Sequence, residues 1–201
     1  LQGTPYIYQG EEIGMTNPGY QSIDDYQDVE SRNIFAIKQA EGMEDAEILA
    51  ILGAKSRDNS RTPMQWSAAP NAGFTNGTPW LKPAANYPEI NAEAALADRD
   101  SVFWHYRDLI RLRKSHPIFT QGDYQELLAG HARIWAYARR ANGQTLLVVS
   151  NFYGRSVTFE PPAELACGEG RLLLGNYPDS PARPQSCELR PYESLIWLME
   201  Q

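Results

Sequence analysis

The sequence has little cysteine, no long apolar run and no excess of basic residues. Only two cysteines occur in 201 residues, which excludes a scaffold held together by disulfides. No apolar run approaches the roughly 20 residues that a membrane-spanning helix needs. The formal net charge is −7, which disfavours non-specific attraction to nucleic acid or to an anionic bilayer. We therefore expect neither a nucleic acid nor a membrane as a partner.

The composition is that of a globular protein. Hydrophobic residues make up 42% and charged residues 21% of the chain, and 11% are aromatic, which excludes an intrinsically disordered segment. The length suits one or two domains on the usual range of roughly 100–200 residues each.

Several chemical signatures are missing as well. There is no glycine-rich phosphate loop and no nucleophile-elbow motif. His105, His116 and His131 lie too far apart for a two-histidine metal motif. Cys167 and Cys187 have no histidine or cysteine at ligand spacing, so we interpret both as structural thiols. The sequence thus predicts no metal site.

The first residues suggest a chain that is one piece of a longer protein. There is no initiator methionine and no signal-peptide pattern. Residues 5–8 read as a short apolar strand between Gly3 and Gly10, of the kind buried inside a sheet. The next hundred residues supply no partner strand of that kind. An edge strand or an extended arm is the alternative interpretation.

The helical patterns occupy the first 120 residues. Residues 28–41 and 45–55 are predicted helices, and a loop rich in Asn, Pro and Gly follows over 57–100. Residues 101–114 carry apolar side chains at helical spacing and end before Pro117.

After residue 120 the periodicity becomes that of short strands. Turn residues separate these segments, a spacing that favours a small antiparallel sandwich. The predicted strands are residues 123–128, 132–140, 145–151, 156–159, 171–174, 186–189 and 194–198.

Two acidic groups are the first candidates for catalysis. Glu11 and Glu12 are adjacent, so on a strand they point to opposite faces and cannot form a catalytic pair. A hydrogen-bonded structural carboxylate is the simpler interpretation. Asp24, Asp25 and Asp28 are interpreted in the same way, as turn and N-cap residues.

The segment 56–66 (SRDNSRTPMQW) is the densest polar stretch in the chain. Arg57, Asp58 and Arg61 stand close to amides and to the indole of Trp66. Arginine donors and aromatic faces suit the recognition of sugar hydroxyls and the orientation of carboxylates. The residues alone leave two interpretations: the wall of a polar, carbohydrate-binding pocket, or an arginine–aspartate pair that only holds a loop.

Two motifs resemble one known family. Residues 3–15 (GTPYIYQGEEIGM) are similar to the eighth-strand motif of the α-amylase-type glycoside hydrolases, family 13. Residues 56–66 are similar to the signature of the oligo-1,6-glucosidase branch, and residues 71–75 and 79–80 continue it. The resemblance extends along essentially the whole chain.

The resemblance implies an α+β chain made of two parts. Residues 1–119 would be the C-terminal remnant of a catalytic (β/α)8 barrel, and residues 120–201 a C-terminal antiparallel β-sandwich. Within the remnant, residues 4–9 would be the eighth strand and 101–114 the final helix, with a long insertion over 15–100.

The resemblance also implies a retaining hydrolase that needs no organic cofactor. Its catalytic carboxylates lie on barrel strands that precede residue 1, so we assign no catalytic residue to this chain and expect no hydrolysis from it alone. Arg61 matches the family arginine that helps to hold the non-reducing glucose, and Arg57 is its near neighbour. Glu12 matches a glutamate that is expected to be structural.

Four stretches resemble most closely the branch members that hydrolyse trehalose 6-phosphate in the cytoplasm. They are residues 26–31, 49–64, 91–97 and 143–149. An oligo-1,6-glucosidase acting on isomaltose-type ends is the alternative. The four lysines show no clustering that would identify a phosphate site.

A non-catalytic role is the remaining alternative. The chain would then be a packing module, or a weak carbohydrate-binding sandwich that uses Trp135 or Trp197. Whatever the role, its partners would be a disaccharide or disaccharide phosphate and the missing N-terminal barrel. The apolar surface left without that barrel would be covered by self-association or stay disordered.

Overall fold

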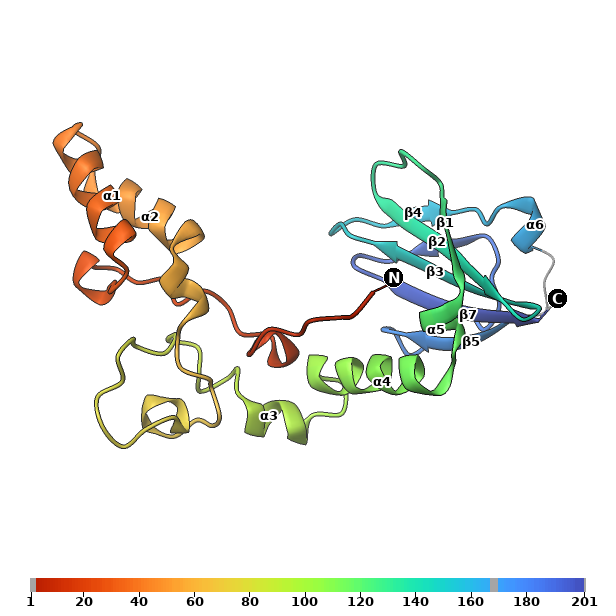
Figure 1. The fold of residues 1–201 in the computed structure, drawn as a ribbon, viewed down its shortest axis with the longest axis horizontal. Helices are drawn as coiled ribbons and strands as arrows, with labels where there is room; N and C mark the ends of the chain where they lie inside the picture. Colours follow the sequence, from red (N-terminus) through yellow and green to blue (C-terminus); the bar gives the residue numbers. More distant parts are fainter. Residues whose placement is uncertain (1–2, 167–169, 201) are drawn as a thin grey trace. The chain divides into compact units, whose positions relative to one another are not determined.

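The computed structural model describes residues 3–166 and 170–200, which form two compact units. One unit comprises Tyr6–Trp104, and the other comprises Leu1–Pro5 together with His105–Gln201. Figure 1 traces the order of the elements from red to blue. Each unit has a hydrophobic core of its own. The predicted division at residue 119/120 stays a prediction.

Two helices anchor the unit Tyr6–Trp104. They are α1 (Val29–Ala40) and α2 (Asp45–Lys55), which confirms both helices expected in this region. Asp28 is the N-cap of α1, as the sequence predicts, because its side chain accepts the N–H of Ser31. The buried core of the unit consists of Tyr20, Tyr26, Phe35, Ile48, Leu52 and Leu81.

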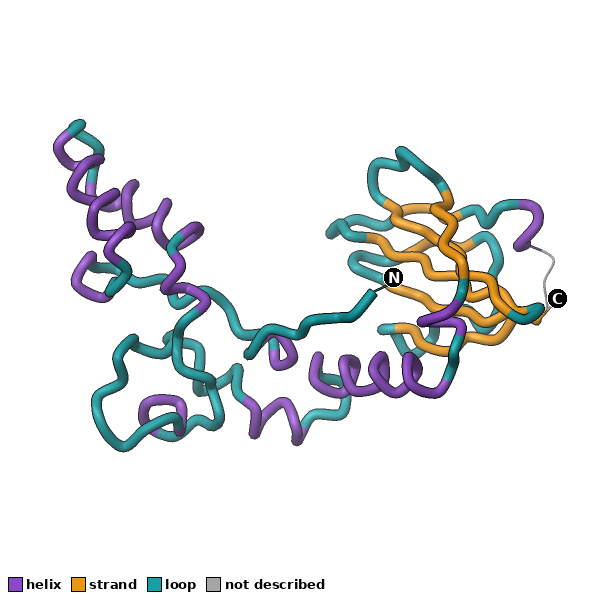
Figure 2. Tube along the Cα trace, viewed as in Figure 1, coloured by secondary structure: helices purple, strands orange, loops and turns teal. Residues whose placement is uncertain are grey.

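The long segment after α2 is mostly loop, as Figure 2 shows in teal. It contains 3-10 turns at Arg57–Ser60 and Pro70–Gly73 and a short helix, α3 (Ala92–Ala97). Gln65 is fully buried, and its amide donates to the carbonyl of Ile90. A buried side-chain amide of this kind satisfies a backbone carbonyl that has no partner in a helix or sheet. The loop is therefore held in one conformation although it has no regular secondary structure.

The segment predicted as a strand at residues 4–9 joins no sheet in the part of the chain that the structure describes. A strand needs a neighbour for its backbone hydrogen bonds, and none of the described strands pairs with it. The segment ends at Gly10, whose φ of 93° lies in the left-handed region. A Cβ at Gly10 would lie 2.5 Å from the sulfur of Met15, so this turn requires glycine.

Two helices precede the sheet. Helix α4 (Val102–Ser115) confirms the predicted helix, and α5 (Ile118–Gln121) is a single turn that the sequence did not indicate. Leu109 and Leu112 of α4 pack on a cluster formed by α5 and the sheet. None of the helices in the described residues has the length and apolar character that a bilayer crossing requires.

The strands form two antiparallel sheets. The larger has the order β1-β2-β3-β7-β5, and the smaller pairs β4 with β6. All seven predicted strands are present with shifts of one or two residues at their ends. Their bounds are β1 Asp123–Leu127, β2 Ile134–Ala141, β3 Gln144–Asn151, β4 Val157–Phe159, β5 Gly170–Gly175, β6 Cys187–Leu189 and β7 Ser194–Glu200. A short helix, α6 (Ala163–Ala166), lies between β4 and β5.

The sandwich expected from the sequence is confirmed, because each face of the larger sheet has its own apolar cluster. One face packs with residues of β4 and β6, and Phe159 stacks on Trp197 with ring centroids 6.4 Å apart. The other face packs with α4 and α5. Trp197 is fully buried and its indole N–H donates to Pro181, so it offers no exposed platform for a sugar.

Candidate functional site

The candidate site is built around the 3-10 turn at Arg57–Ser60. The turn begins because the hydroxyl of Ser56 accepts the N–H of Asp58, which caps its first residues. The same hydroxyl lies 2.7 Å from that of Ser31 on α1. The start of the turn is thereby tied to the first turn of α1.

Asp58 is the buried centre of this turn. Its side chain is fully buried, and Oδ2 accepts the N–H groups of Gln27 and Asp28, each at 2.7 Å. A carboxylate that accepts two backbone donors is held in a fixed orientation. Its other oxygen, Oδ1, has no hydrogen-bond partner and lies 3.6 Å from Nη1 of Arg61.

Asp28 lies between the two arginines. Its Oδ1 is 3.5 Å from a guanidinium nitrogen of Arg57 and 3.5 Å from one of Arg61. Burial alone would raise the pKa of Asp28, but the N–H and hydroxyl of Ser31 and the charge of Arg57 outweigh it and lower that pKa. Arg61 acts in the same direction. Asp28 therefore stays ionised and holds both cations near the turn.

The two arginines are held differently. Arg57 forms a 2.7 Å ion pair with Glu30, and its side chain is 59% exposed. Arg61 contacts carboxylates only at 3.5 and 3.6 Å, and its side chain is 41% exposed. Charge-assisted hydrogen bonds are normally about 2.7–2.9 Å long, so Arg61 is oriented by charge without a short bond to either aspartate. It can form short hydrogen bonds to a ligand without breaking a short ion pair.

Arg61 also lines a cleft of about 200 Å³. Phe74 and Trp80 contribute aromatic surface to this cleft, and their side chains are 51% and 64% exposed. The complete lining is Gln9, Arg61, Thr62, Pro63, Met64, Phe74, Trp80 and Leu81. A cationic fork beside flat aromatic surface is suited to a polyhydroxylated ring, which presents both hydroxyl acceptors and an apolar face.

The other acidic candidates have local partners. Glu12 accepts the N–H of Gly10 at 2.8 Å, within its own turn. Asp25 forms an ion pair with Lys82. Both contacts are structural and link neighbouring parts of the same unit.

The described histidines and cysteines do not form a metal-binding cluster. Among the residues that the structure describes, no group of three His, Cys, Asp or Glu side chains is arranged to hold a metal ion. Burial lowers the pKa of His105 despite the nearby Asp108. Burial also raises the pKa of Cys187, so its thiol stays protonated and unreactive. Cys167 lies outside the described residues.

The structure adds residues that sequence reasoning did not connect with the site. Asp28 was predicted as an N-cap, but its ion pairs with arginines about thirty residues later have no sequence signal. The unusual density of polar residues around Asp58 is the sequence signal that singles out this turn. Phe74 and Trp80 lie in the stretches 71–75 and 79–80 that continue the family signature. Exposed aromatic residues in a loop have no periodicity, so nothing in the sequence placed them beside Arg61.

Two family models match the chain. The model described as the alpha-amylase catalytic domain matches residues 1–122. The model described as the alpha-amylase SusG C-terminal domain matches residues 134–196. The catalytic-domain match alone covers more than half of the chain.

Curated relatives match along the whole chain. An oligo-1,6-glucosidase from Halalkalibacterium halodurans is 51% identical over 199 residues, which are 98% of this chain and 36% of the relative. A trehalose-6-phosphate hydrolase from Escherichia coli is 52% identical over 201 residues, which are 100% of this chain and 36% of the relative. The chain thus spans about a third of the length of these relatives.

A solved structure is similar over the same span. The crystal structure of the Bacillus licheniformis trehalose-6-phosphate hydrolase TreA has a TM-score of 0.96 and 48% sequence identity. The match covers 100% of this chain and 36% of the TreA chain.

Proposed function

Because the chain belongs to the α-amylase family of glycoside hydrolases, we propose that it is the C-terminal part of a retaining α-glucosidase, which we call the parent enzyme. In this proposal its substrate is trehalose 6-phosphate, which it hydrolyses to glucose and glucose 6-phosphate. The parent enzyme acts in the cytoplasm and needs no organic cofactor.

One observation carries the proposal: Arg61 is oriented by two carboxylates at the edge of a cleft with aromatic walls. Active sites of (β/α)8 barrels lie at the C-terminal ends of the strands, where the loop after the eighth strand contributes. The turn that carries Arg61 belongs to that loop in this proposal. Arg61 then binds hydroxyls of the non-reducing glucose, and Arg57 supports the arrangement through Asp28 and Glu30.

The chemistry itself is assigned to residues that precede Leu1. A retaining hydrolase uses one carboxylate as nucleophile and a second as acid and then base, and water releases the glucosyl intermediate. No residue of this chain is given either role. Its contribution is to position the glucose ring relative to those carboxylates, which matters because small misplacements of a bound substrate are costly to rate.

The choice of substrate rests on overall similarity. The phosphate of trehalose 6-phosphate requires cationic donors. The four lysines show no clustering, and two of them are paired, Lys38 with Glu41 and Lys82 with Asp25, so we assign phosphate binding to the preceding part of the enzyme. Hydrolysis of isomaltose-type substrates is the second candidate. It is supported by an oligo-1,6-glucosidase that is as similar to this chain as the trehalose-6-phosphate hydrolase.

Glucose release separates the two substrates. The parent enzyme is assayed on trehalose 6-phosphate and on isomaltose at equal concentrations, with the 201-residue chain as a parallel sample. We expect preference for the phosphorylated disaccharide and no release by the chain alone. Preference for isomaltose would replace the first substrate by the second. Turnover by the 201-residue chain would contradict the assignment of catalysis to the preceding residues.

The role of Arg61 is tested by Arg61→Gln in the parent enzyme, with Arg57→Gln beside it. We expect Arg61→Gln to lower kcat/KM by about tenfold or more, since a hydrogen bond to a charged group contributes roughly 1.5–3 kcal/mol. Arg57→Gln should have a smaller effect, because its shortest contact is to Glu30. Arg171→Gln, an exposed arginine on β5, is the matched control. Equal effects of the Arg61 and Arg171 substitutions would refute a role of Arg61 in substrate binding.

A further inference from the structure

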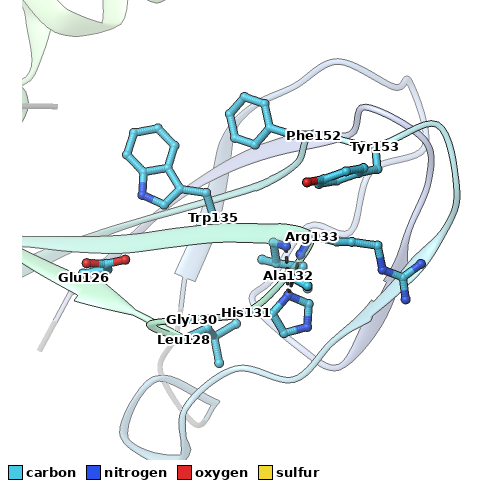
Figure 3. A pocket seen from close by; sticks show the side chains of 10 residues that line it. Glu126, Leu128, Gly130, His131, Ala132, Arg133, Trp135, Phe152 and Tyr153 are labelled. Carbon is cyan, nitrogen blue, oxygen red and sulfur yellow. Dashed lines mark hydrogen bonds between the residues drawn. The ribbon is translucent and has the colours of Figure 1, made fainter.

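Most asparagine side chains in the described residues are tied by hydrogen bonds. Asn151 is the clearest case, because its amide donates to the carbonyls of Arg155 and Arg190, each at 2.8 Å, and its oxygen accepts the N–H of Tyr153. Figure 3 shows Phe152 and Tyr153, the two residues that follow it, beside a cleft of about 460 Å³. The other tied side chains are those of Asn17, Asn59, Asn71, Asn86, Asn91 and Asn176.

Two exposed asparagines lack such a bond and precede a glycine. Asn76 and Asn142 make no side-chain hydrogen bond to any described residue. Because glycine has no Cβ, its backbone nitrogen is unhindered and can approach the side-chain carbon of the asparagine before it. The pairs Asn76–Gly77 and Asn142–Gly143 are the same dipeptide, so differences in their chemistry come from the fold around them.

The hairpin between β2 and β3 holds the second pair. Asn142 and Gly143 form its two-residue turn, which the pair Ala141 and Gln144 closes. Their φ values of 51° and 72° are those of a type I′ turn. In that turn ψ of the first residue is about 30°, which places the nitrogen of Gly143 opposite Cβ of Asn142 across the Cα–C bond. Attack on Cγ needs the nitrogen and Cβ on the same side, so the hairpin would have to open first.

The first pair lies in a loop without such a constraint. Asn76 and Gly77 fall outside every described helix and strand, and Asn76 lies outside the left-handed region. The N–H of Gly77 donates to the hydroxyl of Thr75 at 3.1 Å, and its carbonyl accepts from Asn71 at 2.9 Å. A hydroxyl can turn and donate to the nitrogen once that nitrogen has lost its proton. Rotation about the Cα–C bond of Asn76 disturbs these two local bonds and no strand pairing.

We propose that Asn76 is a site of spontaneous deamidation in the folded protein and that the β2–β3 turn protects Asn142. The nitrogen of Gly77 loses its proton and attacks Cγ of Asn76, so that a C–N bond forms. Nδ2 takes up a proton and leaves as ammonia. Water then opens the cyclic imide at either carbonyl and gives aspartate or isoaspartate.

The reaction changes a segment that contributes to the candidate site. Phe74 and Trp80, on either side of Asn76 in the sequence, line the cleft beside Arg61. Both products add a negative charge to this segment, and isoaspartate also lengthens its backbone by one atom. The inference does not depend on the proposed function, because it concerns the chemistry of the loop and not the ligand of the cleft.

Peptide mapping by mass spectrometry tests the proposal. The folded 201-residue chain is incubated at mildly alkaline pH in water enriched in oxygen-18, which labels each imide that solvent opens during the incubation. Trypsin cleaves after Arg61 and after Arg140, so Asn76 and Asn142 fall in different peptides. We expect Asn76 to be converted at least several-fold faster than Asn142. Comparable rates, or faster conversion of Asn142, would overturn the proposal.

The same chain unfolded in urea is the reference. Unfolding removes the type I′ turn, so conversion of Asn142 should accelerate several-fold and approach the rate of Asn76. A rate for Asn142 that is the same in urea and in the folded chain would overturn the protection by the hairpin.

Gly77→Ala provides a matched variant. A Cβ at Gly77 would have Thr75 Oγ1 as its nearest neighbour, at 3.7 Å, and φ at this position is not positive, so the loop accommodates alanine. The added methyl group hinders attack by the nitrogen. Conversion of Asn76 should therefore slow several-fold in the folded chain, while Asn142 keeps its rate. An unchanged rate at Asn76 would contradict attack by the nitrogen of Gly77.

Discussion

One carboxylate oxygen of Asp58 accepts the backbone N–H of Asp28 at 2.7 Å, although thirty residues separate the two. The carboxylate of Asp28 in turn lies 3.5 Å from Arg61, three residues after Asp58. The two aspartates therefore link the start of α1 to the turn that carries Arg61 through two separate contacts. Whatever Arg61 binds, its position depends on two carboxylates that need not touch the ligand.

Removing the buried carboxylate should destabilise the unit that contains it. Asp58→Ala leaves the N–H groups of Gln27 and Asp28 without an acceptor, and each buried unpaired group costs about 1–3 kcal/mol. We expect the free energy of unfolding to fall by at least about 2 kcal/mol on this basis. Urea unfolding of the 201-residue chain, followed by helical circular dichroism, measures it. The exposed Asp100→Ala is the control, and equal stability of the two variants would contradict the prediction.

The lowered pKa of Asp28 makes stability depend on pH in a defined direction. A carboxylate whose pKa is lower in the folded state stabilises fully above its unfolded pKa, about 3.9, and this contribution is lost as pH falls through the folded pKa. Asp28→Asn should therefore lower the thermal midpoint at neutral pH and have less effect in acid. Melting curves between about pH 6 and pH 3 would show the two proteins converging. Parallel curves would contradict the assignment.

Two neighbouring arginines on β2 provide a matched pair of variants in the sandwich. Arg139 is fully buried and donates to the carbonyls of Phe119 and Gly122, whereas Arg140 is partly exposed and donates to the side chain of Gln125. Lysine cannot reach two carbonyls with a planar fork. Arg139→Lys should cost about 1–3 kcal/mol for a buried acceptor left unpaired. Arg140→Lys should stay within about 0.5 kcal/mol. Urea unfolding followed by tryptophan fluorescence compares them, and equal losses would refute the interpretation.

The separate 201-residue chain should associate with itself. Without a barrel, the exposed aromatic surface of Phe152 and Tyr124 has no partner, and uncovered apolar patches favour association. We expect the sedimentation coefficient to rise with concentration. Phe152→Ser should reduce this rise. A single monomeric species at all concentrations, with both units folded, would contradict the prediction.

Regular elements could be predicted from the sequence where local patterns mark them. Short apolar segments between turn residues identified β2 and β3, and the apolar face at helical spacing identified α4, within one or two residues. Glycine and proline marked most of their ends. Helix α5 was missed because a single turn of Ile118–Gln121 is too short to show a period.

The contacts that define the candidate site could not be predicted in the same way. Asp58 meets Gln27 and Asp28 through the fold, and no spacing rule links residues thirty positions apart. Residues 4–9 were expected to form a strand but join neither described sheet. The reason is related, because a strand depends on neighbours that the local sequence does not specify. Arg57 and Arg61 were found through the resemblance of a whole motif, and their ion-pair partners only through the structure.

The two hydrogen bonds of the Arg139 guanidinium limit where C-terminal domains can be exchanged between related enzymes. The guanidinium donates to the carbonyls of Phe119 and Gly122, and, apart from Leu1–Pro5, the unit that contains the sandwich begins at His105, within α4. A crossover placed where the strands start would cut through this connection and combine an arginine from one parent with a helix turn from another. A crossover upstream of α4 would transfer the sandwich together with the helices that its sheet requires.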